Sequence, residues 1–241
     1  MLKKDRSSNV KFSGSKQTIA ALAKISEAIT SDLYLEDILR LIVTVTAEVM
    51  GSKICSLMLL DKSSQELVVK ATQSVSENYN KKPNVKLGQG IAGIVAKEGK
   101  PITVFDVRKD ERYLNRDIAI NENLCSLLSV PLIFKGQAIG VLNSYTAKPH
   151  RFVQSEINIL KSIANQAAIV IENFRLVVES KVIKEELESR KVIEKAKGIM
   201  MKQENLSEEE AYNRIRKYSM DNRKSMKEVA EAIILTEDMK K

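Results

Sequence analysis

The sequence contains little of several residue types, and each shortage argues against a class of protein. It has no tryptophan, nine glycines and four prolines in 241 residues. So little glycine and proline fits an ordinary soluble chain rich in helix. Its only cysteines, Cys55 and Cys125, are too few for a disulfide scaffold and fit a reducing compartment. An ordinary globular chain rich in helix, located in the cytoplasm, is therefore expected.

Long hydrophobic runs are also missing. No apolar stretch approaches the roughly 18 residues that cross a bilayer, so no membrane partner is expected. The first stretch, MLKKDRSSNVKFSGSK, is basic and polar without an apolar core, which predicts no signal peptide. Residues 1–15 are predicted to be a disordered tail.

Positive charge is plentiful and unevenly placed. The formal net charge is +8 and the sequence pI is about 9.3. This suits a nucleic-acid partner, although many basic proteins bind none. Lysine and arginine are dense between Arg190 and Lys227, whereas acids gather at Glu208–Glu210. Those acids lie in the first turn of a predicted helix, where their negative charge interacts favourably with the helix dipole.

The first two thirds of the chain alternate between helical and strand patterns. Residues 16–29 and Tyr34–Met50 read as helices, and Gly51 is a left-handed cap of the second. An antiparallel sheet flanked by helices, an α+β fold, is expected. Strands are predicted at 53–61, 66–72, 102–105, 124–134 and 137–145, and helical segments at 91–98 and 108–123.

Several short motifs in this region resemble the GAF domain, a small-molecule-sensing relative of the PAS fold. They are Gly88-Gln89-Gly90-Ile91-Ala92-Gly93, Gly99-Lys100-Pro101, Asp106-Val107, Ser129-Val130-Pro131-Leu132, Gly140-Val141-Leu142-Asn143, and the segments 163–168 and 171–173. The GAF domain is assigned to residues 16–176.

The resemblance implies a ligand pocket between one face of the sheet and the glycine-rich loop with its short helix. The alternative is a GAF domain that binds no ligand and only dimerises or relays a signal. A cyclic-nucleotide signature, Asn-Lys-Phe-Asp-Glu, is missing, so the ligand is left as an unknown small molecule with no cofactor assigned. The predicted lining residues are Ser56, Met58, Leu87, Ile91, Ile94, Val95, Phe105, Leu127 and Ser129.

A long helix is predicted from Val153 to Met201. Its apolar residues follow steps of four and three as far as Val178, which fits either a coiled-coil seam or a helix that packs on its own domain. The phase then shifts, and a shift locally unwinds a coiled coil. Residues 177–189 are taken as a coiled-coil linker of a homodimer, and Val178–Leu187 as the segment that converts a change in the sensor dimer into movement of the output modules.

Three helices are predicted after this linker. Ser207 followed by Glu210 is a capping box, and Ser225 begins the last helix. The segments Ala196-Lys197-Gly198 with Met200-Met201, 206–211, 214–220 and 229–234 together resemble the ANTAR domain, the RNA-binding module of bacterial transcription antiterminators. A three-helix ANTAR bundle is assigned to residues 190–238.

That resemblance implies a dimer that binds paired stem-loops in a nascent leader transcript and prevents terminator formation. RNA affinity comes chiefly from cations that face phosphates. A glycine within a helix costs about 1 kcal/mol relative to alanine, and Gly198 is interpreted as a point of close approach. The predicted RNA-binding residues are Lys195, Lys197, Gly198, Lys202, Arg214, Arg216, Ser219, Arg223 and Lys224.

Two alternatives stay open. A DNA-binding regulator would carry a similar basic three-helix unit, although DNA is not the expected partner. A GAF-fold methionine sulfoxide reductase would need a cysteine cluster that Cys55 and Cys125 do not supply. No nucleophile and base pair, metal cluster or phosphorylated receiver pattern is recognised, and His150 reads as a loop residue. No enzymatic activity is therefore expected.

Overall fold

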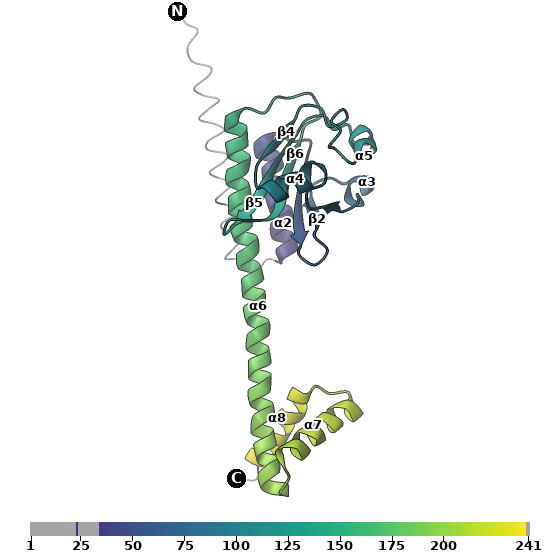
Figure 1. Cartoon of the computed structure of the whole chain (residues 1–241). Helices are drawn as coiled ribbons and strands as arrows, with labels where there is room; N and C mark the ends of the chain where they lie inside the picture. The colour runs from purple at the N-terminus through teal and green to yellow at the C-terminus, as the bar shows by residue number, and fades with distance from the viewer. Residues whose placement is uncertain (1–22, 24–33, 240–241) are drawn as a thin grey trace, which may run out of the picture. The chain divides into compact units, whose positions relative to one another are not determined.

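The computed structural model describes Ala23 and residues 34–239 (Figure 1). The predicted tail at 1–15 and the predicted helix at 16–29, apart from Ala23, lie outside the described residues. The chain divides into two compact units between Phe174 and Arg175.

An antiparallel sheet forms the centre of the first unit. Its strand order is β3-β2-β1-β6-β5-β4, and each neighbouring pair is antiparallel. The prediction of an α+β fold with an antiparallel sheet is confirmed. The strands are β1 (Ile54–Asp61), β2 (Glu66–Thr72), β3 (Val85–Lys86), β4 (Ile102–Val104), β5 (Leu127–Phe134) and β6 (Gln137–Tyr145).

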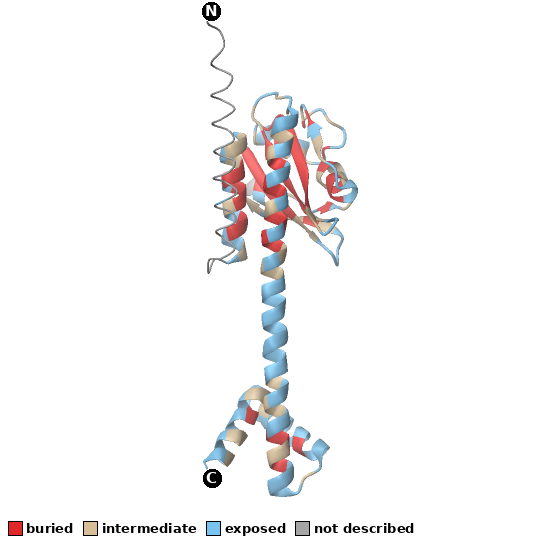
Figure 2. Ribbon diagram, turned by 90° about the vertical axis from the view of Figure 1, so that its left-hand side faces the viewer, coloured by how far each residue is buried: buried red, intermediate tan, exposed pale blue. Residues whose placement is uncertain are grey.

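One face of this sheet packs against helix α2 (Leu35–Met50) and the first part of helix α6 (Gln154–Glu204), as the buried residues in Figure 2 show. Side chains alternate between the two faces of a strand, so Leu128, Val130 and Leu132 of β5 share this face. Leu160 and Ile171 of α6 are fully buried in the same cluster. This stretch of the apolar seam is therefore a domain-packing surface.

The opposite face packs against helix α4 (Gly90–Glu98), which follows the turn Lys86–Gln89. Gly93 permits this packing, because a Cβ there would lie 2.3 Å from the backbone oxygen of Lys86. Gly99 ends the helix in the left-handed conformation at φ 66°. The short helices α3 (Glu77–Asn80) and α5 (Arg116–Asn121) lie in the connections.

The prediction of a helical segment at 108–123 is wrong for its first half. Only Arg116–Asn121 is helical, and the preceding residues form turns. The Asp106 carboxylate accepts bonds from the backbone N–H and the guanidinium of Arg108, and Asp110 does the same for Arg112. Such local side-chain bonds offer the backbone an alternative to the helix.

The sequence also failed to predict β3 and α3, and β5 begins at Leu127 rather than residue 124.

The second unit comprises the end of α6 with α7 (Glu208–Asn222) and α8 (Met226–Asp238). Ser207 and Ser225 each form a complete capping box, with Glu210 and Glu228 respectively, which confirms the predicted helix starts. The three helices share a small apolar core of Ala196, Met200, Ala211, Ile215, Val229 and Ala230.

Helix α6 is continuous over 51 residues and belongs to both units. Residues 176–188 within it are all exposed, including Leu176, Val178, Val182, Ile183 and Leu187. None of the described helices combines the length and the apolar character that crossing a membrane requires.

Candidate functional site

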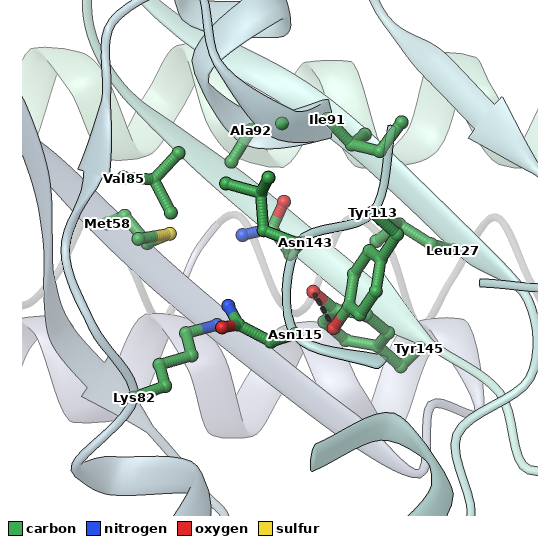
Figure 3. Close-up of a pocket in the computed structure, with 12 residues that line it drawn as sticks. Met58, Lys82, Val85, Ile91, Ala92, Tyr113, Asn115, Leu127, Asn143 and Tyr145 are labelled. Carbon is green, nitrogen blue, oxygen red and sulfur yellow. Dashed lines mark hydrogen bonds between the residues drawn. The ribbon is translucent and has the colours of Figure 1, made fainter. Parts of the chain in front are cut away.

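A small cavity lies between the sheet and helix α4 in the first unit (Figure 3). Its volume is about 30 Å³, which is room for roughly two water molecules. The predicted residues Met58 of β1, Ile91 of α4 and Leu127 of β5 line it. The sequence analysis missed other lining residues, including Lys82, Val85, Tyr113, Asn115, Asn143 and Tyr145.

The strand register explains which residues meet at the cavity. Ser56 of β1 lies opposite Asn143 of β6, and Leu127 of β5 lies opposite Tyr145 of β6. Residues at alternate positions along each strand point to the same side, so these side chains gather on the face that α4 covers. The alternation of side chains along β6 could therefore have identified Asn143 and Tyr145 from the sequence. Lys82 and Tyr113 come from irregular segments that have no periodicity.

The other predicted pocket residues differ in their surroundings. Ser56 is buried, and its Oγ accepts bonds from the hydroxyl of Tyr79 at 3.0 Å and from Nδ2 of Asn143 at 3.4 Å. Ser129 is buried opposite Asn143 but does not line the cavity. Val95 is buried in the adjacent apolar cluster, against which the half-buried Leu87 packs; Ile94 is also half-buried.

Phe105 does not belong to the cavity. Its side chain is 51% exposed, and the Arg151 guanidinium lies 5.2 Å from its ring centroid. The strand β4 ends one residue earlier, at Val104. Phe105 therefore occupies the surface beside the sheet.

Three buried tyrosines pack together in the apolar cluster between the sheet and α4. Tyr145 packs edge-on against Tyr79 and Tyr113, with ring centroids 6.2 and 6.3 Å apart. Burial raises the pKa of all three phenols, so they are neutral at physiological pH. The hydroxyl groups can therefore both donate and accept hydrogen bonds.

The two cysteines are both enclosed in the GAF unit. Cys55 and Cys125 are both buried, and burial raises the pKa of the Cys55 thiol well above its usual value. A thiol, rather than the nucleophilic thiolate, is therefore present at Cys55. Within residues 34–239, no group of His, Cys, Asp and Glu side chains is arranged to hold a metal ion. His150 lies before α6, with Nε2 2.9 Å from a Glu156 carboxylate oxygen.

The second unit carries the predicted RNA-binding residues, and the cations among them differ in exposure and in pairing. Lys195, Lys202, Arg216 and Arg223 are exposed and form no ion pair with any described residue. Lys195 and Lys202 are seven positions apart, which places them on one face of α6. Arg214 and Lys224 are exposed but paired, with Glu204 and with Glu228 respectively.

Lys197 lies in a different environment from those exposed cations. Its side chain is 8% exposed, while its ammonium donates to Glu194 at 2.9 Å and to Glu208 at 2.8 Å. The hydrogen bond to Glu208, and then that to Glu194, raises the pKa of Lys197. Its charge is therefore already compensated within the unit.

The two uncharged candidates also differ. A Cβ at Gly198 would meet no other atom within 4 Å, so internal packing does not require a glycine there. Ser219 donates from Oγ to the backbone oxygen of Lys224 at 2.6 Å. This bond closes the end of α7, where Arg223 adopts the left-handed conformation at φ 52°.

Two sequence families match the chain. The GAF domain matches residues 33–172, and the ANTAR domain matches residues 182–234. A solved GAF domain of a phosphoenolpyruvate-protein phosphotransferase from Coxiella burnetii has a TM-score of 0.61 and 26% identity over 68% of this chain and 98% of its own. The free methionine-R-sulfoxide reductase of Neisseria meningitidis has a TM-score of 0.57 at 22% identity, over 66% of this chain and 91% of its own, and shares the fold.

Relatives of the two units occur in different proteins. A methyl sulfide methyltransferase-associated sensor from Methanosarcina acetivorans is 27% identical over 65% of this chain and 16% of its own length. The nitrate regulatory protein of Klebsiella oxytoca is 42% identical over 22% of this chain and 13% of its own length. The transcriptional regulatory protein PdtaR of Mycobacterium tuberculosis is 39% identical over 22% of this chain and 26% of its own length.

The chain thus spans no more than about a quarter of the length of these curated relatives. The family matches cover most of the described residues, and the sheet, the helix α4 and the three-helix unit agree with them. The chain therefore belongs to the GAF family and carries an ANTAR domain after its GAF domain.

Proposed function

We propose that the protein is a signal-responsive transcription antiterminator that binds RNA through its ANTAR unit. The observation that carries the proposal is a set of exposed cations in that unit that form no ion pair with a described residue, Lys195, Lys202, Arg216 and Arg223. Cations of this kind supply most of the affinity for phosphates. The regulators among the relatives of this unit support the same class of function.

In this proposal each ANTAR unit of a dimer holds one of two stem-loops in a nascent leader transcript. Holding the second stem-loop keeps the overlapping terminator from forming, so that transcription continues. The GAF domain makes this activity depend on a signal, and the protein works in the cytoplasm without enzymatic activity.

The dimer is proposed from the exposed stretch of α6. Leu176, Ile183 and Leu187 are separated by seven and four residues, which is heptad spacing, and each is about half exposed or more in the single chain. Apolar residues in such a stripe indicate a partner helix. A second copy of this chain is the natural partner, because the same stripe would then face itself in a parallel coiled coil.

Binding of the purified full chain to a two-hairpin RNA would test the RNA proposal. The comparison ligands are the same RNA with scrambled loops and a duplex DNA, each measured at two salt concentrations. Loop-dependent binding of the RNA that falls at least several-fold in Arg216→Ala and Lys202→Ala is expected. Lys62→Ala, at an exposed turn of the GAF unit, is the charge-matched control and should bind normally.

Three other outcomes would argue against a specific RNA-binding antiterminator. Preferred binding to duplex DNA would favour the DNA-binding regulator. Equal and strongly salt-dependent binding to all three nucleic acids would reduce the finding to a basic surface without specificity. Turnover of free methionine sulfoxide would contradict a purely regulatory role.

A further inference from the structure

In the part of the chain that the structure describes, the cavity under α4 is lined by one cation, Lys82, and by no anion. Lys82 lines it, and its Nζ lies 4.4 Å from the centroid of the Tyr79 ring and donates to the Tyr79 hydroxyl at 3.3 Å. Among the described residues, no carboxylate lies within ion-pairing distance of this ammonium. Burial lowers the pKa of Lys82 to about 8. A cation in such a place lacks its counter-charge.

A second lining group also lacks a partner. Asn143 is 1% exposed, and within the described part of the chain its Oδ1 accepts no hydrogen bond. Its Nδ2 donates to Ser56 Oγ at 3.4 Å, and the same Oγ accepts from the Tyr79 hydroxyl. A buried acceptor without a donor is destabilising, so a native fold normally supplies one.

The two unmet requirements lie in one cavity and are complementary to a single kind of molecule (Figure 3). Lys82 requires a negative charge, and Asn143 requires a hydrogen-bond donor. The rest of the lining, which includes Met58, Val85 and Leu127, offers apolar contact to carbon atoms. An inorganic anion would satisfy the first requirement, but it would offer neither a donor to Asn143 nor carbon atoms to the apolar lining.

We propose that this cavity binds a small organic acid that carries a hydroxyl or amino group, with its carboxylate at Lys82 and its donor at Asn143. The volume of about 30 Å³ restricts the ligand to the smallest members of this class unless the cover moves. Part of that cover is made by Lys82 and Asn115, which come from short connections rather than from the sheet. This assignment deepens the proposed sensor role by naming the class of signal.

Two rival occupants make the proposal testable. Water alone would fill the same volume and bridge Lys82 to Asn143. A small anion without a donor group would pair with Lys82 only. The ligand panel separates these cases: glycolate and L-lactate carry both groups, acetate lacks the donor, glycolamide lacks the charge, and nitrate is inorganic.

The experiment is calorimetric titration of the full-length protein with each compound at pH 7, accompanied by thermal melts. Glycolate or L-lactate should bind at least tenfold more tightly than acetate, glycolamide and nitrate. Lys82→Met should remove at least tenfold of that affinity, whereas Lys81→Met, an exposed lysine one position earlier, should retain it. Lys82→Arg should recover part of the lost affinity, which a purely structural role for Lys82 would not predict.

Three results would overturn the proposal. They are equal binding of acid and amide, binding that survives Lys82→Met, and no binding by any compound while the cavity residues are intact. A melt of each ligand-free variant establishes that it is folded. RNA binding is measured on the same preparations without added acid, so a failure of acid binding with RNA binding intact concerns the cavity alone, and the converse concerns the RNA proposal alone.

Discussion

Lys197 near the end of α6 donates to the Glu208 carboxylate across 2.8 Å, and this bond joins α6 to the first turn of α7. The aliphatic part of Lys197 is covered, while Glu194 and Glu208 are 66% and 70% exposed. Long lysine side chains commonly lie this way, with the stem packed and the ammonium at the surface. Lys197 therefore stabilises the packing of α6 against the start of α7.

Replacing Lys197 with methionine should lower the melting temperature of the ANTAR unit. Because the pKa of Lys197 is raised, its contribution is present below its unfolded pKa and is lost as the pH rises through its folded pKa. The lowered pKa of Glu208 makes the partner's contribution disappear as the pH falls through its folded value. Circular dichroism melts between pH 3 and 11 would measure both limits.

Lys195→Met is the matched control for this variant, because Lys195 is exposed and two residues away on the same helix. Its melting temperature should stay close to that of the unchanged protein. The salt dependence of RNA binding should be shallower for Lys195→Met and unchanged for Lys197→Met. A shallower salt dependence for Lys197→Met would show instead that its ammonium leaves the carboxylates for a phosphate.

Gly198→Ala should separate stability from RNA binding. A Cβ at this position meets nothing within 4 Å, and alanine is favoured over glycine in a helix by about 1 kcal/mol, so thermal stability should rise. If RNA approaches the backbone here, affinity should fall several-fold in the same variant. A stabilised protein with undiminished RNA affinity would contradict a contact at Gly198.

The capping boxes should matter for the stability of the ANTAR unit. Ser207 Oγ accepts from the Glu210 backbone N–H at 3.2 Å, and Ser225 does the same for Glu228. Ser207→Ala and Ser225→Ala should each cost about 1 kcal/mol in the free energy of unfolding. Chemical denaturation followed by helical circular dichroism would measure this, with Ser162→Ala, on the exposed surface of α6, as a control. Equal midpoints for all three variants would contradict the role of the caps.

Gly140 in β6 should tolerate no side chain. A Cβ there would lie 2.2 Å from the backbone oxygen of Met58 and 3.0 Å from Leu132. Gly140→Ala should therefore destabilise the GAF unit by roughly 1–3 kcal/mol, as overpacking of a core does. Gly136→Ala tests a different constraint, because space is open there but φ is 79°. It should cost less than Gly140→Ala in the same denaturation assay.

Lys82→Met should stabilise the protein at neutral pH. The pKa of Lys82 is lowered to about 8, so the folded state binds fewer protons than the unfolded state between about pH 8 and 10.5, and stability rises with pH over that range. The neighbouring Tyr79, Tyr113 and Tyr145 have raised pKa values, so in the folded state they are neutral at both pH 7 and pH 9.5. The variant should lose this rise and gain roughly 1–3 kcal/mol at pH 7. Unfolding at pH 7 and 9.5 would measure the difference, and an unaltered pH profile would contradict it.

Much of the fold could be predicted because most elements carry strong local signals. Helix α2 is amphipathic and ends at Gly51, and the capping boxes at Ser207 and Ser225 mark two helix starts. The hairpin of β1 and β2 shows apolar strands around a polar turn. Each of these signals involves residues near one another in the sequence.

The cavity could be predicted only in part. Ser56, Met58, Leu127 and Ser129 share the face of the sheet that α4 covers, and the period of two along a strand groups such residues once the face of one of them is known. Lys82 comes from a segment without period, and its position depends on how the chain between β2 and α4 folds back. The turns at Asp106 likewise depend on side-chain bonds that a helical pattern does not reveal.

In the proposed dimer, the exposed stretch of α6 would give the protein a property that depends on its concentration. Residues 176–188 contact no core of either unit, so within one chain their helical order relies on the weak local preferences that leave short isolated helices marginal in water. A second chain would bury Leu176, Ile183 and Leu187 and supply the missing stabilisation. The share of chains in which this connection is ordered would then rise with protein concentration, and cellular abundance itself would become an input to the regulator.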